Sequence, residues 1–221
     1  MPNHVETKIW LMPKDGKVLT EKQIEEFFSQ FISIDPDPRD GEDPRMFDFN
    51  TILPQSDNIW LGAVGGDEKE NLEGIEKYGG LDAVKQDLKE RKSFPLTEQP
   101  CLTDEQIKRF GMVNGLSWNR EHWETKWGAY YCSYDFKSIF SETDYTNPNV
   151  VFYTAWSVPE QILRMVREKA LEQGYDIWCE FGGELDNPGE YTEGVFMYWN
   201  AVLDEMNGTL ERQGDPIDVH E

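Results

Sequence analysis

Cysteine is scarce in this chain, and no long apolar run is present. The three cysteines among its 221 residues, Cys101, Cys132 and Cys179, are odd in number and too widely spaced for a C-x-x-C metal site. We therefore expect reduced thiols and neither a disulfide framework nor a bound metal. No stretch approaches the ~18 apolar residues of a membrane span, and the start lacks the basic and apolar regions of a signal peptide. The sequence predicts a cytoplasmic protein.

Catalytic motifs are also missing. The chain has three histidines, and neither His4 nor His122 accompanies a serine or cysteine in a recognised nucleophile motif. The glycines between Gly62 and Gly66 lack the following Lys-Ser/Thr of a phosphate-binding loop. The sequence thus favours a protein without catalytic residues or a cofactor, although an enzymatic role stays open.

Basic residues are half as frequent as acidic ones. The chain holds 43 Asp and Glu against 21 Lys and Arg, for a net charge of -22, yet it also carries 8 Trp, 9 Tyr and 12 Phe. Those aromatic residues can build a packed core, so the charge is a property of the surface. Such a surface repels phosphate backbones and attracts basic proteins, which disfavours direct binding of nucleic acid. An alternative is that the charge serves only solubility.

Alternation and helical periodicity predict an α+β domain. Residues 5–12 alternate as a strand, and Thr20 with Gln23 has capping-box spacing before an apolar stripe that predicts a helix over 20–33. Segments 129–136, 150–156, 175–181 and 194–199 are typical of strands. Ser157 with Glu160 predicts a second capping box, which opens a helix ending near 174.

These elements predict an antiparallel sheet with helices on one face. We expect one domain over 1–206, interrupted by an irregular, mostly helical insert at about 58–118, and a frayed acidic tail over 207–221.

Four segments of the chain carry a resemblance: Met1 to Val5, Phe47 to Asn50 with Leu53-Pro54, Trp123 to Tyr130, and Thr154 to Pro159. Together they resemble the YubB ferredoxin-like family of phage and plasmid proteins. The resemblance implies a ferredoxin-like α+β fold and a mobile-element origin, and it supplies no activity or catalytic residue. The chain departs from the family where Glu124 stands in place of the usual glycine, Gly128 in place of asparagine and Val158 in place of proline.

The charge and the resemblance together predict an accessory protein that acts by binding a host protein. The hypothesis is an acidic mimic of nucleic acid that inhibits a defence nuclease or another nucleic-acid-binding complex, in the cytoplasm of the host cell. The candidate partner-binding residues are surface carboxylates: Asp35, Asp37, Asp40, Glu42, Asp43, Asp67, Glu68, Glu184 and Asp186. A purely structural role in the mobile element, and a homodimer through a sheet edge, stay open.

The alternative hypothesis is a small-ligand or nucleotide site, enzymatic or not, in which indole rings and a lysine bind a flat anionic molecule. Its candidate residues are Trp123, Lys126, Trp127 and Glu180. The competing interpretation is core packing, in which Trp156 and Trp178 complete an aromatic core and Lys126 extends to solvent. Glu180, Glu184 and Asp186 lack the spacing of a calcium loop, so we predict no metal there.

Overall fold

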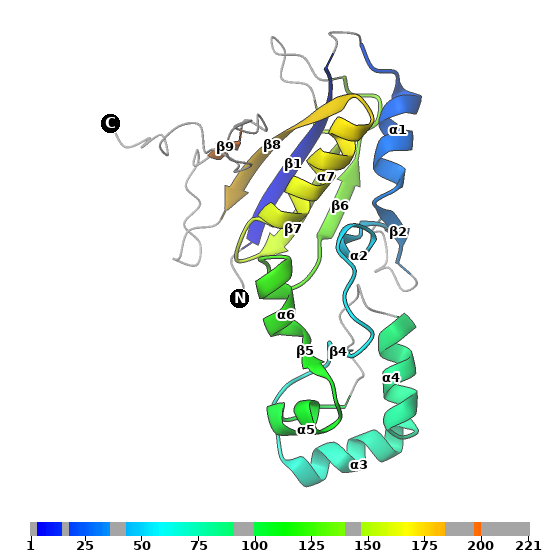
Figure 1. Cartoon of the computed structure of the whole chain (residues 1–221), viewed down its shortest axis with the longest axis vertical. Helices are drawn as coiled ribbons and strands as arrows, with labels where there is room; N and C mark the ends of the chain where they lie inside the picture. The colour runs from blue at the N-terminus through cyan, green and yellow to red at the C-terminus, as the bar shows by residue number, and fades with distance from the viewer. Residues whose placement is uncertain are drawn as a thin grey trace, which may run out of the picture.

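An antiparallel sheet forms the centre of the molecule (Figure 1). The computed structural model describes residues 4–14, 18–35, 43–90, 100–139, 147–183 and 197–199. The sheet has the strand order β6-β7-β1-β8-β9. Its strands are β1 (His4–Pro13), β6 (Tyr130–Tyr134), β7 (Val150–Ala155), β8 (Tyr175–Gly183) and β9 (Met197–Trp199). The prediction of a mixed α/β protein with an antiparallel sheet is confirmed.

Strand β1 lies in the middle of this sheet, between β7 and β8. Thr7 is opposite Phe152 of β7, and Trp10 is opposite Trp178 of β8. Ile9 and Leu11 of β1 are fully buried on one face. Alternate residues of a strand point to opposite faces, so the strict alternation read from the sequence decides which side of β1 enters the core.

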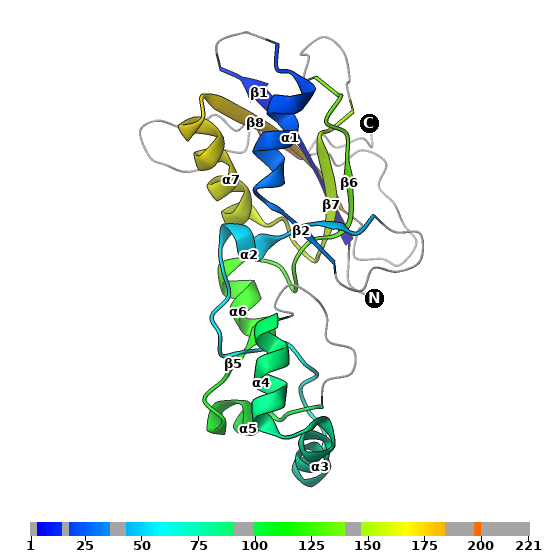
Figure 2. The same cartoon turned by 90° about the vertical axis from the view of Figure 1, so that its right-hand side faces the viewer.

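Two helices, α1 (Glu21–Ser29) and α7 (Glu160–Glu172), cover the same face of the sheet (Figure 2). Their buried residues join those of the strands in one apolar cluster, with Ile24, Phe27 and Phe28 from α1 and Ile162 and Val166 from α7. Burying a side chain of this size stabilises the fold by about 1.5–3 kcal/mol. This packing therefore fixes both helices on the sheet.

The first predicted capping box is confirmed. The Thr20 hydroxyl accepts the backbone N–H of Gln23, and the Gln23 side chain accepts the backbone N–H of Thr20. The helix ends sooner than predicted, at Ser29, because Ile32–Ile34 forms strand β2 and pairs with β3 (Arg45–Phe47). Branched residues at 32 and 34 suit a strand once a partner strand is available.

The second predicted capping box is wrong. Helix α7 has Pro159 at its N-cap and no side-chain cap. The Ser157 hydroxyl donates instead to the backbone carbonyl of Glu124, in a loop far away in the sequence. In the middle of the helix, the Arg167 guanidinium pairs with the Asp176 carboxylate at 2.7 Å and joins α7 to β8. Tertiary contacts therefore replaced the local cap.

After β3, helix α2 (Phe49–Ile52) places Phe49 in the apolar cluster of the sheet. The chain then forms a lobe that extends away from the sheet (Figures 1 and 2). Its elements are β4 (Ile59–Trp60), α3 (Glu68–Tyr78), α4 (Leu81–Glu90), α5 (Asp104–Arg109), β5 (Val113–Asn114) and α6 (Gly115–His122). The short strands β4 and β5 are parallel. The lobe has an apolar cluster of its own, formed by Trp60, Ile75, Val84, Leu88, Leu102, Ile107 and Met112. In the described part of the chain, no helix is both long and apolar enough to cross a bilayer.

Candidate functional site

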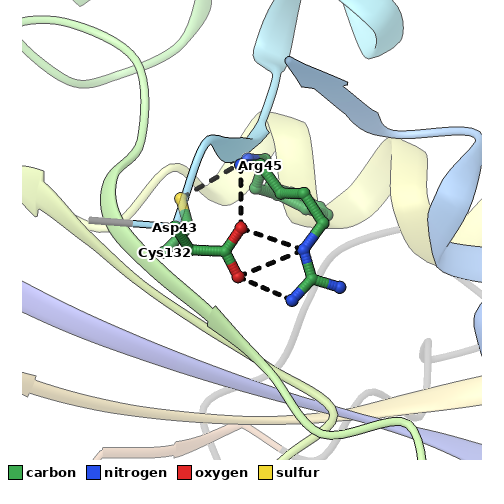
Figure 3. Close-up of polar contacts among 4 residues, drawn as sticks. Asp43, Arg45 and Cys132 are labelled. Carbon is green, nitrogen blue, oxygen red and sulfur yellow. Dashed lines mark hydrogen bonds and ion pairs between the residues drawn. The ribbon is translucent and has the colours of Figure 1, made fainter. Parts of the chain in front are cut away.

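Asp43, a predicted partner-binding residue, is held by an ion pair. Its carboxylate faces the Arg45 guanidinium, with Oδ2 2.6 Å from Nη2 (Figure 3). The hydrogen bond from Arg45 is the largest cause that holds the pKa of Asp43 below its usual value. The Arg45 guanidinium also lies 4.7 Å from the centroid of the Tyr134 ring. The pair is partly exposed to solvent, so it contributes little to stability and leaves the carboxylate at the surface.

Two other candidate carboxylates support the lobe. Asp67 caps helix α3 by accepting the backbone N–H groups of Lys69 and Glu70. The Glu68 carboxylate lies 2.8 Å from the Arg109 guanidinium of α5. Both acids are exposed. They are therefore accessible to a partner while also holding local structure.

The remaining candidates are divided between the described and undescribed parts of the chain. Asp35 follows β2 and is half-buried, with its backbone N–H donating to the carbonyl of Pro44 at 2.7 Å. The other five lie outside the described residues: Asp37, Asp40, Glu42, Glu184 and Asp186.

The predicted aromatic site is not brought together as one pocket. Trp123 is 1% exposed and its indole N–H donates to the Leu53 carbonyl at 3.0 Å, so its ring packs in the core. Lys126 and Trp127 lie nearer the surface, with the ammonium 4.5 Å from the Trp127 ring centroid. Glu180 lies on β8 opposite Lys8. The interpretation of core packing, with Lys126 extending to solvent, fits Trp123 and Lys126 but not the partly exposed Trp127.

A different tryptophan, Trp156, reaches the surface beside Lys126. It is 45% exposed, which contradicts its predicted place in an aromatic core. The Lys126 ammonium lies 4.8 Å from the Trp156 ring centroid, and the Arg120 guanidinium lies 4.4 Å from it. Cations at this distance from an indole face are attracted by its quadrupole. We call Arg120, Lys126, Trp127 and Trp156 the tryptophan–cation patch.

Backbone strain is concentrated around this patch. Among the described residues other than glycine, positive φ values occur at Glu124 (62°), Tyr131 (51°) and Trp156 (79°). Glu124 and Tyr131 flank the segment that carries Lys126 and Trp127. The centroid of the Trp127 ring lies 6.4 Å from that of the Tyr130 ring. Such conformations cost about 1–3 kcal/mol each and persist only where the surroundings hold them. No sequence pattern predicts the positive φ of Trp156, because β7 ends at Ala155 and an apolar residue at 156 looks like a continuation of the strand.

The groups most often used in covalent catalysis are poorly placed for it. Burial raises the pKa of Cys132 to about 11 and raises the pKa of Cys179 as well, so both thiols stay protonated at neutral pH. His122 stacks on Trp118, and His4 lies 2.6 Å from the Tyr130 hydroxyl. Within the described ranges, no three His, Cys, Asp or Glu side chains gather as a metal site would require.

Comparisons of the chain with protein-family models, with curated proteins and with solved structures found no match.

Proposed function

We propose that this chain is an accessory protein of a phage or plasmid that acts by binding a host protein rather than by catalysis. The partner is a nucleic-acid-binding protein with a basic surface, such as a defence nuclease, and the acidic protein inhibits it by occupying the cleft that takes DNA or RNA. The observation that carries the proposal is the charge of -22 on a folded chain of 221 residues. At this charge, association with a basic surface is steered and fast.

The order of the helices and strands supports the phage or plasmid origin that the resemblance implies. Leaving aside the segment from β2 to α6, the chain runs through β1, α1, β6, β7, α7 and β8. In the sheet these strands have the order β6-β7-β1-β8. We take this β-α-β-β-α-β order as support for a ferredoxin-like core, which is part of the proposal. In this proposal the lobe from β4 to α6 is the mostly helical insert predicted at about 58–118. A ferredoxin-like core is what the resemblance to the YubB family leads us to expect.

The charge is unevenly distributed along the chain. Residues 172–221 contain thirteen acidic residues and a single basic one, Arg212, which gives this stretch a net charge of -12. More than half of the excess negative charge therefore belongs to less than a quarter of the sequence. This concentration of acidic residues in one part of the sequence supports a docking role over simple solubility.

Capture from a lysate of the bacterial host, at ~50 mM and ~500 mM salt, tests this proposal. We expect the tagged protein to retain a basic nucleic-acid-binding protein at low salt and to lose it at high salt. Added DNA should displace the same partner, because both compete for one cleft. The purified partner should then lose its nucleic-acid binding when the acidic protein is added.

Two variants with the same change in net charge separate a local surface from bulk charge. Asp40→Asn with Glu42→Gln alters the predicted acidic loop, and Glu25→Gln with Glu26→Gln alters exposed positions on α1. We expect the loop variant to weaken partner binding severalfold more than the α1 variant. A partner that is retained equally at both salt concentrations would contradict the charge-mimic mechanism.

A further inference from the structure

The tryptophan–cation patch is assembled from three separate elements. Arg120 comes from the last turn of α6, Lys126 and Trp127 from the loop that follows it, and Trp156 from the connection between β7 and α7. The Lys126 ammonium lies within 5 Å of two indole centroids, at 4.5 Å from Trp127 and 4.8 Å from Trp156. Two cations and an exposed ring therefore share one surface.

Hydrogen bonds between the two loops hold this surface rigid. The Lys126 backbone N–H donates to the Ala155 carbonyl at 3.4 Å, and the Gln161 backbone N–H donates to the Glu124 carboxylate at 3.0 Å. The Asn119 side chain donates to the Lys126 carbonyl at 3.1 Å. These contacts fix the backbone on both sides of Trp156 at its positive φ. Exposed side chains on a preorganised backbone lose little entropy when a ligand binds.

In the described part of the chain the two cations of the patch have no acidic partner, unlike three other arginines. Arg45, Arg109 and Arg167 each pair with a carboxylate at 2.8 Å or less. For Arg120 and Lys126, by contrast, no ion pair with a carboxylate occurs among the residues that the structure describes. The chain has about two acids for every base. Two unpaired cations at one indole are therefore available to an anionic ligand.

We infer that the tryptophan–cation patch is a binding site for a free nucleoside phosphate. The base packs against the exposed part of the Trp156 and Arg120 stack, and the phosphate accepts hydrogen bonds from the guanidinium and the ammonium. A flat ring with an attached phosphate matches this chemistry, since indoles stack on bases of any sequence and arginine binds phosphate in a planar, two-pronged manner. The overall charge of -22 repels a polymer with many phosphates, so a mononucleotide fits better than a nucleic-acid strand.

This ligand site is independent of the acidic docking role and goes beyond it. Calorimetric titration of the full chain with ATP and GTP at ~50 mM salt tests this ligand site. Adenosine and inorganic triphosphate, the two parts of ATP, are titrated separately. We expect both nucleotides to bind with a dissociation constant below ~1 mM, and each of the two parts to bind at least about tenfold more weakly.

Two variants remove one part of the patch each. Trp156→Gly deletes the ring at a position where glycine accepts φ of 79° without strain, so the protein is expected to fold. Arg120→Gln deletes one cation. Each should weaken nucleotide binding by about tenfold, the size expected for one stacked base or one charged contact. The matched control is Arg109→Gln, which alters an arginine that also lies over an aromatic ring, 5.3 Å from Phe110, and should leave binding unchanged.

Several outcomes would overturn the inference. They are absence of nucleotide binding by the unaltered protein, unchanged binding in both patch variants, and triphosphate binding as tight as that of ATP. Tighter binding of a single-stranded oligonucleotide than of any mononucleotide would also overturn it, because the ligand would then be a polymer.

Discussion

The side-chain oxygen of Asn149 accepts the backbone N–H of Leu11 at 2.8 Å, although the two residues are 138 positions apart. The Asn149 amide group also donates to the carbonyls of Asp135 at 3.0 Å and Ser138 at 2.7 Å. The backbone N–H of Asn149 donates to the carbonyl of Ile9 at 2.9 Å. One fully buried residue thus joins the segment after β6 to the central strand of the sheet.

Asn149→Ala should destabilise the protein by about 3 kcal/mol, because one buried and two partly buried backbone groups lose their partner at once. Asn149→Asp should cost at least as much, since a carboxylate keeps the acceptor but loses both donors and carries a buried charge. Urea unfolding measures both. Asn147→Ala is the control, because the Asn147 side chain bonds Asp135 at 3.2 Å on the exposed surface and should change stability by less than about 0.5 kcal/mol. Equal losses at 147 and 149 would contradict the assigned role.

Because the Cys132 thiol is buried, we expect the folded protein to lose stability at alkaline pH. Burial raises the pKa of Cys132 to about 11 from the 9.0 of an ordinary thiol. Below pH 9 the thiol is neutral in both the folded and the unfolded chain, and its contribution to stability is complete. Between pH 9 and 11 only the unfolded chain releases the proton, so the free energy of unfolding falls, by about 2 kcal/mol in total.

Urea unfolding at pH 8, 9, 10 and 11 measures this fall, and Cys132→Ala isolates it from other titrating groups. The variant loses the contact between the Phe47 backbone N–H and the sulfur, 3.4 Å, at every pH equally. Its stability should therefore decline less steeply above pH 9 than that of the unaltered protein. Parallel declines would show that the Cys132 thiol is not the group responsible.

The sheet and its covering helices follow from local patterns, which explains why they could be predicted. In β1 buried residues alternate with partly buried ones from His4 to Ile9, and in α7 the apolar residues recur on one helical face. Helix α3 was not predicted as a separate helix, because Asn71 and Ile75 are its only buried residues and most of its other residues are charged. A helix with so narrow an apolar stripe leaves little periodic signal.

The tryptophan–cation patch could not be predicted, because its geometry depends on contacts between distant loops. Trp156 continues the apolar pattern of β7, and only its positive φ turns the ring to the surface. Arg120 comes from a helix that gave no clear periodicity. One hint was present in the sequence: Glu124 stands where the resembling family tends to have glycine, and its φ of 62° is one that glycine adopts freely.

Gly115 packs directly against strand β4 of the lobe, and Gly115→Ala should destabilise this contact. A Cβ atom at Gly115 would lie 2.5 Å from the backbone oxygen of Trp60, and also within 2.9 Å of Leu61 and Ile59. Because a backbone atom cannot rotate away, we expect the free energy of unfolding to fall by about 1–3 kcal/mol.

Hydrogen exchange measures where the protein opens. It should become faster in β4 and β5 while β1 stays protected, since the lobe has its own apolar cluster. Gly182→Ala is the control, because a Cβ there meets no atom within 4 Å, and unfolding should be unchanged or slightly delayed. If Gly115→Ala instead accelerated exchange in the lobe and the sheet equally, the two would unfold as one cooperative unit, and the second cluster would not be an independent source of stability.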